Sequence, residues 1–580
     1  MKKFLIGLLA GILLTILTGV IVFFAVLRFG ARTPTVDNNS TLVLSLEGDL
    51  PERAPVEIPV PFLERETPVT LQETWLTLHR AAGDPRIKAV VLMPHDLDIG
   101  WGKLQEIHDD LAAFKHSGKP LYAFLRNPGT REYYLATTAD RIFMTPTDTL
   151  DVKGLRAEMV FVQDTLNKVG VQMEVLHVGK YKDAGDMFTR TSATPETLEV
   201  MNQILDQYYG NLVDTIAAGR KKKPADVRAL IDNGPFLSSQ ALSSGLIDSL
   251  EFEDQMYGEL KKQLQENEIR RISNRNYLKS VPASRRTENA RRVALVVGQG
   301  LIVRGPAREM QEDLMTSGGM IKLLRQVEDD SSIRGVIFRI DSPGGDGVAS
   351  DDILHAVENL SKKKPLVISM SDVAGSGGYF VAMSGDPIIA YPNTLTGSIG
   401  VLMVKPNLHG LFDKLGLKLQ TLSRGRYANL DSESTPMDAA ARAKFTESLN
   451  EFYKEFVTRV ADGRHRKYDE IEPLAQGRVW LGAQAKSNGL IDQLGGLDSA
   501  VELIRKKAQI APGERIALVP YPQRRSILDL LLSRNENDEF SFDASLDSLL
   551  KQLHVPARRW IEAMLQGGTL RIMPYAISVK

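Results

Sequence analysis

The feature that most constrains this chain is an internal repeat. Residues 87–92, Ile-Lys-Ala-Val-Val-Leu, match residues 333–338, Ile-Arg-Gly-Val-Ile-Phe, at an offset of 246. Residues 245–248 and 489–492 both read Gly-Leu-Ile-Asp, at an offset of 244. An offset that stays nearly constant over about 160 residues predicts two homologous domains in one chain, so both copies must reach the same fold.

Each copy alternates short apolar runs with helical patterns. In the second copy, strands are predicted at 335–340, 365–370 and 388–391, and helices at 351–360 and from 376 onward. Strands that alternate with helices at this spacing predict an α/β fold with a largely parallel sheet.

Composition excludes several classes of protein. Apolar residues make up 43% and charged residues 25% of the 580 residues, which is typical of globular domains. The 71 basic and 72 acidic residues give a net charge of −1, so no basic excess favours nucleic acid as a partner. There is no cysteine, which excludes disulfides, thiolate zinc sites and cysteine nucleophiles. No phosphate-binding loop motif occurs, and neither a metal nor another cofactor is expected.

The N-terminus predicts a membrane anchor. Residues 4–27 carry no charge, Lys2 and Lys3 precede them, and Arg28 and Arg32 follow. A run of this length crosses a hydrocarbon core of about 30 Å. The alternative is a cleaved signal peptide, but its apolar region is usually about 7–15 residues, and no good small-x-small cleavage site follows. We therefore expect a single-pass anchor in a bacterial inner membrane, with the bulk of the chain in the periplasm.

These observations divide the chain into four parts. They are an anchor at 1–35, a first domain plus linker at 36–285, a second domain at 286–512 and a C-terminal extension at 513–580. Leucines at helical spacing between 546 and 553 predict that the extension is helical. It would pack on the second domain or a neighbouring subunit, with a role at the membrane surface as the alternative.

The two copies differ where chemistry is expected. The second copy has Asp-Ser-Pro-Gly-Gly at 341–345, directly after a strand, where the first has His-Asp-Leu-Asp-Ile at 95–99. It has Ala-Gly-Ser-Gly-Gly at 374–378, where the first has Pro-Gly-Thr-Arg-Glu at 128–132. Either glycine-rich stretch alone is typical of a tight turn. Two of them at successive strand ends, both missing from the sister copy, indicate a functional site instead.

Ser376 is the candidate nucleophile of this site. It stands among small residues at the start of a helix, where unpaired N–H groups favour a developing oxyanion. The Gly344-Gly345 turn could supply a second N–H group. A serine hydroxyl is nevertheless inert without a base.

Histidine and lysine are the two candidate bases. His355, His409 and His465 flank Ser376 in the second copy, in ordinary helical or loop contexts, so a Ser-His-Asp arrangement is a weak alternative. Lys182 ends the motif Gly-Lys-Tyr-Lys, and Ala428 stands at its place in the second copy. The reference pKa of lysine is about 10.4, so Lys182 must be buried in an apolar site to act as a base.

These motifs together resemble the signal peptide peptidase A family, the long, membrane-anchored bacterial form also called protease IV. The resemblance covers roughly residues 40 to 510 and rests on Gly-Lys-Tyr-Lys, Asp-Ser-Pro-Gly-Gly, Ala-Gly-Ser-Gly-Gly-Tyr and Thr-Leu-Thr-Gly-Ser-Ile-Gly at 394–400, in that order. It implies tandem ClpP/crotonase-like domains and an endopeptidase that degrades signal peptides left in the membrane. It also implies a dome-shaped homotetramer whose active sites lie where first and second domains meet.

The resemblance assigns roles to individual residues. Ser376 would be the nucleophile, Lys182 the general base, and Ser398 the residue whose hydroxyl holds the lysine. The oxyanion hole would be formed by the backbone N–H groups of Gly344, Gly345 and Gly377. One position departs from the family pattern, because Asp183 follows the lysine where the family commonly has serine. A carboxylate beside an amine raises the pKa of that amine, unless Asp183 points to the opposite face of an extended segment.

Two alternatives from other classes stay open. A crotonase-like acyl-CoA enzyme would share the fold and the oxyanion turns but would need neither a serine nucleophile nor an anchor. A non-catalytic membrane scaffold would hydrolyse no peptide. The expected partners of a peptidase are apolar peptides, the membrane and further copies of the chain.

Overall fold

The computed structural model describes residues 34–54, 68–281, 290–306 and 314–522, the backbone of 569–572, and isolated positions before residue 19. Within these ranges no helix combines the length and the apolar character that crossing a membrane requires. Nearly all of the predicted anchor, and the predicted helices of the C-terminal extension, lie outside the described residues.

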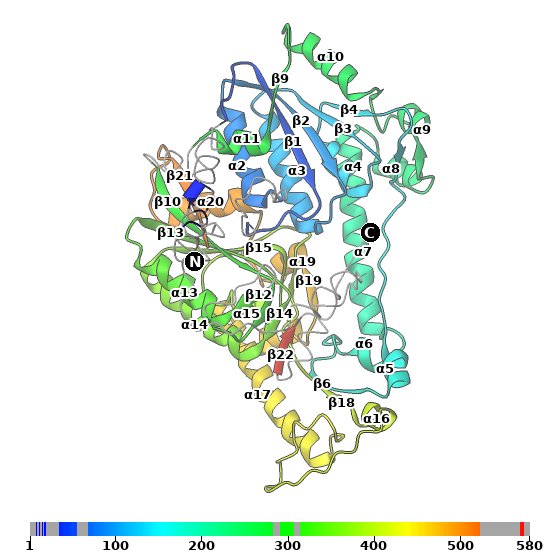
Figure 1. Cartoon of the computed structure of the whole chain (residues 1–580), viewed down its shortest axis with the longest axis vertical. Coiled ribbons are helices and arrows are strands. Elements are labelled where there is room, and N and C mark those ends of the chain that lie inside the picture. Colours follow the sequence, from blue (N-terminus) through cyan, green and yellow to red (C-terminus); the bar gives the residue numbers. More distant parts are fainter. Residues whose placement is uncertain are drawn as a thin grey trace.

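The first copy forms a parallel sheet in the order β8-β4-β3-β2-β1-β9 (Figure 1). Its strands are β1 (Ser40–Glu47), β2 (Ile87–His95), β3 (Leu121–Leu125), β4 (Arg141–Met144), β8 (Ser249–Leu250) and β9 (Arg270–Ser273). One face packs against α2 (Leu71–Gly83), α3 (Trp101–Lys115) and α7 (Pro195–Gly219), and the other against α10 (Glu253–Leu264). Because helices cover both faces of the sheet, the central strands carry apolar residues on both faces.

The second copy repeats this plan in the order β19-β17-β15-β13-β10-β21, and off this path β16 pairs with β15 and β20 pairs with β16. Its strands are β10 (Arg291–Gln299), β13 (Ile333–Ser342), β15 (Leu366–Gly375), β16 (Ile388–Ala390), β17 (Leu395–Gly397), β19 (Val479–Leu481), β20 (Gln493–Leu494) and β21 (Ile516–Tyr521). Helices α13 (Ser317–Asp329), α14 (Gly347–Lys363) and α17 (Ala439–Gly463) cover one face, and α20 (Leu497–Lys507) covers the other. The predicted α/β class is confirmed, and β13, β15 and β16 coincide with the predicted strands.

A third sheet joins the two copies, in the order β12-β11-β14-β22-β18-β6. Its strands are β6 (Gln172–Val178), β11 (Leu301–Val303), β12 (Leu314–Thr316), β14 (Gly344–Asp346), β18 (Val401–Asn407) and β22 (Thr569–Ile572). β6 from the first copy pairs antiparallel with β18 from the second along seven residues. This pairing places the segment that follows β6 directly against the second copy.

A buried ion cluster fixes the junction between the copies. The guanidinium of Arg339, on β13, has no exposed surface and contacts the carboxylates of Glu52, at 2.9 Å, and Glu106, both from the first copy. The guanidinium also donates hydrogen bonds to the hydroxyls of Ser369 and Ser371. Buried charges of this kind persist only when paired, so the cluster requires both copies to be docked.

Candidate active site

The structure brings Lys182, Ser376 and Ser398 together at this junction. The Lys182 Nζ lies 2.8 Å from Ser376 Oγ, 2.9 Å from Ser398 Oγ and 3.0 Å from the Ser398 carbonyl oxygen. All three residues have 0% of their surface exposed. The amine comes from the first copy and both hydroxyls from the second, so neither copy alone holds this arrangement.

Ser376 occupies a sharp turn between β15 and α15 (Gly377–Phe380). Its φ of 53° and ψ of −114° are rare for a residue with a side chain and cost on the order of 1–3 kcal/mol. Its N–H group donates to the Gly397 carbonyl at 2.8 Å, which ties the turn to β17. Small residues on either side allow this strained turn, which presents the hydroxyl to Lys182.

The loop at 476–478 positions both partners of Ser376. Its Gln476 carbonyl accepts the Tyr181 N–H at 2.8 Å, and its Arg478 carbonyl accepts the Ser398 N–H at 2.7 Å. Gly477 has a φ of +77°, and a Cβ there would lie 2.5 Å from the Cβ of Lys182. Only glycine allows this approach. Sequence reasoning missed this loop, since a single glycine near a strand carries no chemical signal.

The predicted oxyanion glycines lie next to the strained turn. Gly344 and Gly345 form part of β14, and Gly377 is the first residue of α15, where N–H groups lack intrahelical acceptors. The Gly344 N–H donates to Ser342 Oγ at 3.2 Å. A Cβ on Gly345 would lie 1.9 Å from the Ile302 carbonyl oxygen, because β11 passes that close.

Strand β22 runs between β14 and β18. It is antiparallel to both, with Ile572 opposite Gly344 and Leu570 opposite Leu402. The structure therefore contains a place for one extended strand beside the Gly344-Gly345 turn, and the sequence offered no signal for this pairing.

A second buried ion group lies at the end of β13, just before the Gly344-Gly345 turn. The Lys103 amine, on α3, lies 2.9 Å from Asp341 and 3.8 Å from Asp372. Asp372 also accepts the backbone N–H groups of Gly100 and Lys103, and so caps α3 from the other copy. Burial raises the pKa of Asp372 to about 6, because the effect of Lys103 only partly opposes it.

Asp183 and the candidate histidines take no part in the contacts to Ser376. The Asp183 carboxylate is buried and accepts a hydrogen bond from the Thr197 hydroxyl in the first turn of α7. His355, His409 and His465 are all exposed, whereas Ser376 is fully buried. The ionisable side chain in contact with Ser376 Oγ is therefore that of Lys182.

The corresponding turns of the first copy are closed by a carboxylate. Buried Glu132 accepts the Leu97 N–H at 2.6 Å and the Gly129 N–H at 3.0 Å, so it bridges 95–99 to 128–132. Gly378 stands at its place in the second copy, where a Cβ would lie 2.6 Å from the Ser342 carbonyl oxygen. Because the Ser342 backbone packs against Gly378, no side chain fits there, and the bridging carboxylate of the first copy has no counterpart in the second.

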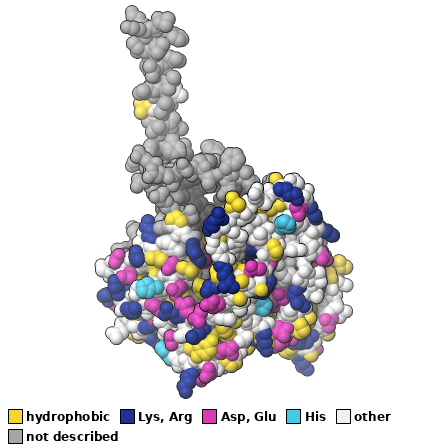
Figure 2. Space-filling model, turned by 90° about the horizontal axis from the view of Figure 1, so that it is seen from below, with side chains coloured by type: hydrophobic (Ala, Val, Ile, Leu, Met, Phe, Trp, Pro, Cys, Tyr) yellow, Lys and Arg dark blue, Asp and Glu magenta, His cyan; other side chains and the backbone are white. Residues whose placement is uncertain are grey.

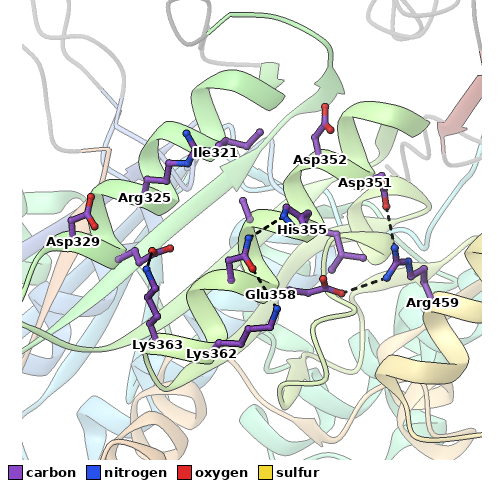
Figure 3. A pocket seen from close by; sticks show the side chains of 14 residues that line it. Ile321, Arg325, Asp329, Asp351, Asp352, His355, Glu358, Lys362, Lys363 and Arg459 are labelled. Carbon is purple, nitrogen blue, oxygen red and sulfur yellow. Dashed lines mark hydrogen bonds and ion pairs between the residues drawn. The ribbon is translucent and has the colours of Figure 1, made fainter.

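A cavity of about 780 Å³ lies elsewhere, between α13, α14 and α17 (Figure 3). Several of its charged side chains form ion pairs: Arg459 lies 3.8 Å from Asp351 and 3.7 Å from Glu358, and Lys363 contacts Glu328. His355 contacts Asn359 there, at 3.1 Å. The Lys182–Ser376 contact lies outside this cavity.

Comparisons with known proteins identify the family of this chain. The profile of peptidase family S49 matches residues 113–267 and 358–511, once in each copy. The chain belongs to peptidase family S49. A chloroplastic serine protease SPPA from Arabidopsis thaliana is 33% identical over 84% of this chain and 73% of its own. A protease 4 from Haemophilus influenzae is 29% identical over 83% of this chain and 82% of its own.

Membership of the family makes the chain a serine peptidase, and the enzyme class predicted from the sequence is confirmed. Among solved structures, a ClpP1 mutant from Listeria monocytogenes matches 36% of this chain and 94% of its own, with 13% identity and a TM-score of 0.24.

Proposed function

We propose that this serine peptidase is a membrane-anchored endopeptidase in which Ser376 is the nucleophile and Lys182 the general base. The observation that carries the proposal is the 2.8 Å contact between Lys182 Nζ and Ser376 Oγ, two fully buried groups from different copies. Removing an amine from water favours its neutral form, and only the neutral form can accept a proton. The proposed substrates are cleaved signal peptides and other unfolded apolar peptides.

The contacts support a two-step acyl transfer. The neutral Lys182 amine takes the Ser376 proton as Oγ attacks the peptide carbonyl, and the ammonium then donates that proton to the leaving amine. Ser398 accepts hydrogen bonds from Lys182 through both Oγ and its carbonyl, which keeps the amine directed at Ser376. Backbone N–H groups of Gly345 and Gly377, with Gly344, would stabilise the oxyanion. Water then hydrolyses the acyl-enzyme.

The place held by β22 suggests how substrate binds. A peptide that replaces Thr569–Ile572 would pair with β14 and β18 through its backbone, beside the oxyanion turn. Recognition through backbone hydrogen bonds tolerates many sequences but requires an unfolded chain. β18 is buried along its whole length and begins with Val401, Leu402 and Met403, which favours apolar side chains.

Removal of β22 is expected to strengthen substrate binding. Deleting residues 569–580 should lower the KM for an unfolded peptide by about tenfold, equivalent to about 1.4 kcal/mol, while kcat stays near its original value. Leu570→Pro, which removes a backbone donor from the same strand, should act in the same direction. Steady-state kinetics measure both variants. An unchanged or higher KM in both would show that substrate binds elsewhere.

The remaining parts of the proposal concern location and assembly. We place the anchor at residues 4–27, in a bacterial inner membrane, with ClpP/crotonase-like domains at 36–285 and 286–512 in the periplasm. The uncharged run behind Lys2 and Lys3 supports the anchor. We further propose a homo-oligomer, with the tetramer that the resemblance implies.

Covalent labelling tests the proposed nucleophile. A fluorophosphonate probe, which phosphonylates activated serines with loss of fluoride, should modify Ser376 in the full chain, as located by peptide mass spectrometry. Ser384, another serine of the second copy, bonded to Asp386, serves as the internal control and should stay unmodified. An acyl-CoA enzyme or a scaffold would leave Ser376 unmodified as well, and that outcome would overturn the proposal.

A further inference from the structure

The pairing of β6 with β18 joins one element from each copy. The register is antiparallel, from Gln172 opposite Asn407 to Val178 opposite Val401. Figure 1 shows these strands together at the end of the molecule that also carries α5 (Gln163–Val169) and α16 (His409–Lys414). Because the chain is a repeat, each strand has a counterpart in the other copy, and the counterparts can be located.

The counterparts follow from the sequence at an offset of 246. Leu-Asn-Lys-Val-Gly at 166–170 corresponds to Phe-Asp-Lys-Leu-Gly at 412–416, and Gly154 corresponds to Gly400. The counterpart of β6 is therefore 418–424, and the counterpart of β18 is 155–161. Within the described residues neither segment belongs to a strand, although Ala157 forms an isolated bridge.

The segment 418–424 exposes apolar side chains at positions where the corresponding side chains of β6 are partly buried. Leu419 is 62% and Leu422 is 84% exposed, whereas Met173 and Leu176, at the same places in β6, are partly buried against the two cores. Every residue from 413 to 429 is exposed. Figure 2, viewed from this end, shows hydrophobic side chains gathered in patches among the charged ones. An apolar run of this kind marks an interaction surface.

The segment 155–161 has the properties of an open sheet edge. Leu155, Ala157 and Met159 pack against the core of the first copy, and the residues between them are exposed. This alternation is that of a strand with one covered face. Val160 is 59% exposed, whereas its counterpart Pro406 is buried within β18.

We propose that 418–424 of one chain pairs antiparallel with 155–161 of a second copy, as β6 pairs with β18 inside the chain. The repeat predicts the register, with Val160 opposite Leu419 and Ala157 opposite Leu422. This pairing deepens the homo-oligomer of the proposed function and rests on it. Each chain offers one segment of each kind, so the contact is head-to-tail and generates a ring where the rotation closes.

The proposed junction is a copy of the catalytic junction without its chemistry. Offset by 246, Lys182 becomes Ala428, Ser376 becomes Thr130 and Ser398 becomes Val152. The contact between subunits thus keeps the assembling strands and lacks the amine and both serines. Each chain contributes one reactive junction and one purely structural junction.

Cysteine cross-linking tests the register, because the chain has no cysteine of its own. Full-length Val160→Cys and Leu419→Cys chains, with different tags, are co-expressed and oxidised in detergent. Side chains directly opposite each other in a sheet lie within disulfide reach. We expect a two-chain species carrying both tags, and none from either variant expressed alone. Leu419→Cys with Leu237→Cys, whose leucine is 59% exposed in the first copy, is the matched control and should not cross-link.

A second pair of variants tests the surface without cysteines. Leu419→Asp with Leu422→Asp should reduce the oligomer to single chains of 64.2 kDa in light scattering, whereas Leu237→Asp should leave it intact. An oligomer that fails to cross-link at 160 and 419 and survives the aspartates would overturn this pairing alone. A wild-type chain that is monomeric in detergent would overturn the homo-oligomer as well. Labelling of Ser376 reports on the peptidase separately from both.

Discussion

Ser376→Ala and Lys182→Ala are each expected to lower kcat/KM for an unfolded peptide by about 10⁴-fold or more. The first removes the atom that would form the acyl-enzyme in the proposed mechanism. The second removes the proposed base, whose amine lies 2.8 Å from the Ser376 hydroxyl. The two groups act as a unit, so the double variant should lose little more than either single variant.

Lys180→Ala is the matched control for the lysine. Lys180 lies two residues before Lys182 and is exposed, with its amine 4.8 Å from the centre of the Tyr181 ring. It should retain nearly full activity, and light scattering should give all variants the same mass. Activity retained in Lys182→Ala of unaltered mass would disprove the dyad.

Arg339→Ala is expected to destabilise the chain by about 3–5 kcal/mol. The guanidinium is fully buried, and its removal leaves the carboxylates of Glu52 and Glu106 buried without their partner. The loss should be largest at neutral pH and smaller in acid, where protonation removes the uncompensated charges. The midpoint of urea denaturation of the full chain measures it.

Two further variants separate charge from packing at this site. Arg304→Ala removes an arginine whose side chain is 60% exposed and paired with Asp346, and it should cost at most about 1 kcal/mol. Combining Arg339→Met with Glu52→Gln and Glu106→Gln should recover much of the stability, because no unpaired charge remains. A wild-type midpoint for Arg339→Ala would show that the cluster does not hold the copies together.

The sequence predicted the parts of this molecule that repeat. The strands at 335–340 and 365–370 follow from local apolar runs, and the α/β class follows from their alternation with helices. The difference between the copies also singled out Ser376 and Lys182 as candidates, because a glycine-rich turn present in only one of two related domains stands out against its sister.

Contacts between distant segments were beyond the sequence. Arg339 interrupts an apolar strand where the first copy has Met93, and that substitution was the available signal for a buried ion cluster. Its partners could not be found, since Glu52 and Glu106 lie more than 230 residues away along the chain. The loop at 476–478 and the pairing of β22 act through backbone groups, which every residue carries and no motif reveals.

Division of the reacting groups between two halves also determines what a broken chain can do. A fragment that ends before Ser376 carries an amine with nothing to deprotonate, and one that begins after Lys182 carries an alcohol that nothing activates. Incomplete synthesis or internal nicking followed by separation therefore yields inert pieces. In the proposed mechanism, hydrolysis therefore requires that the two halves be folded against each other, and a separated half cannot digest unfolded chains.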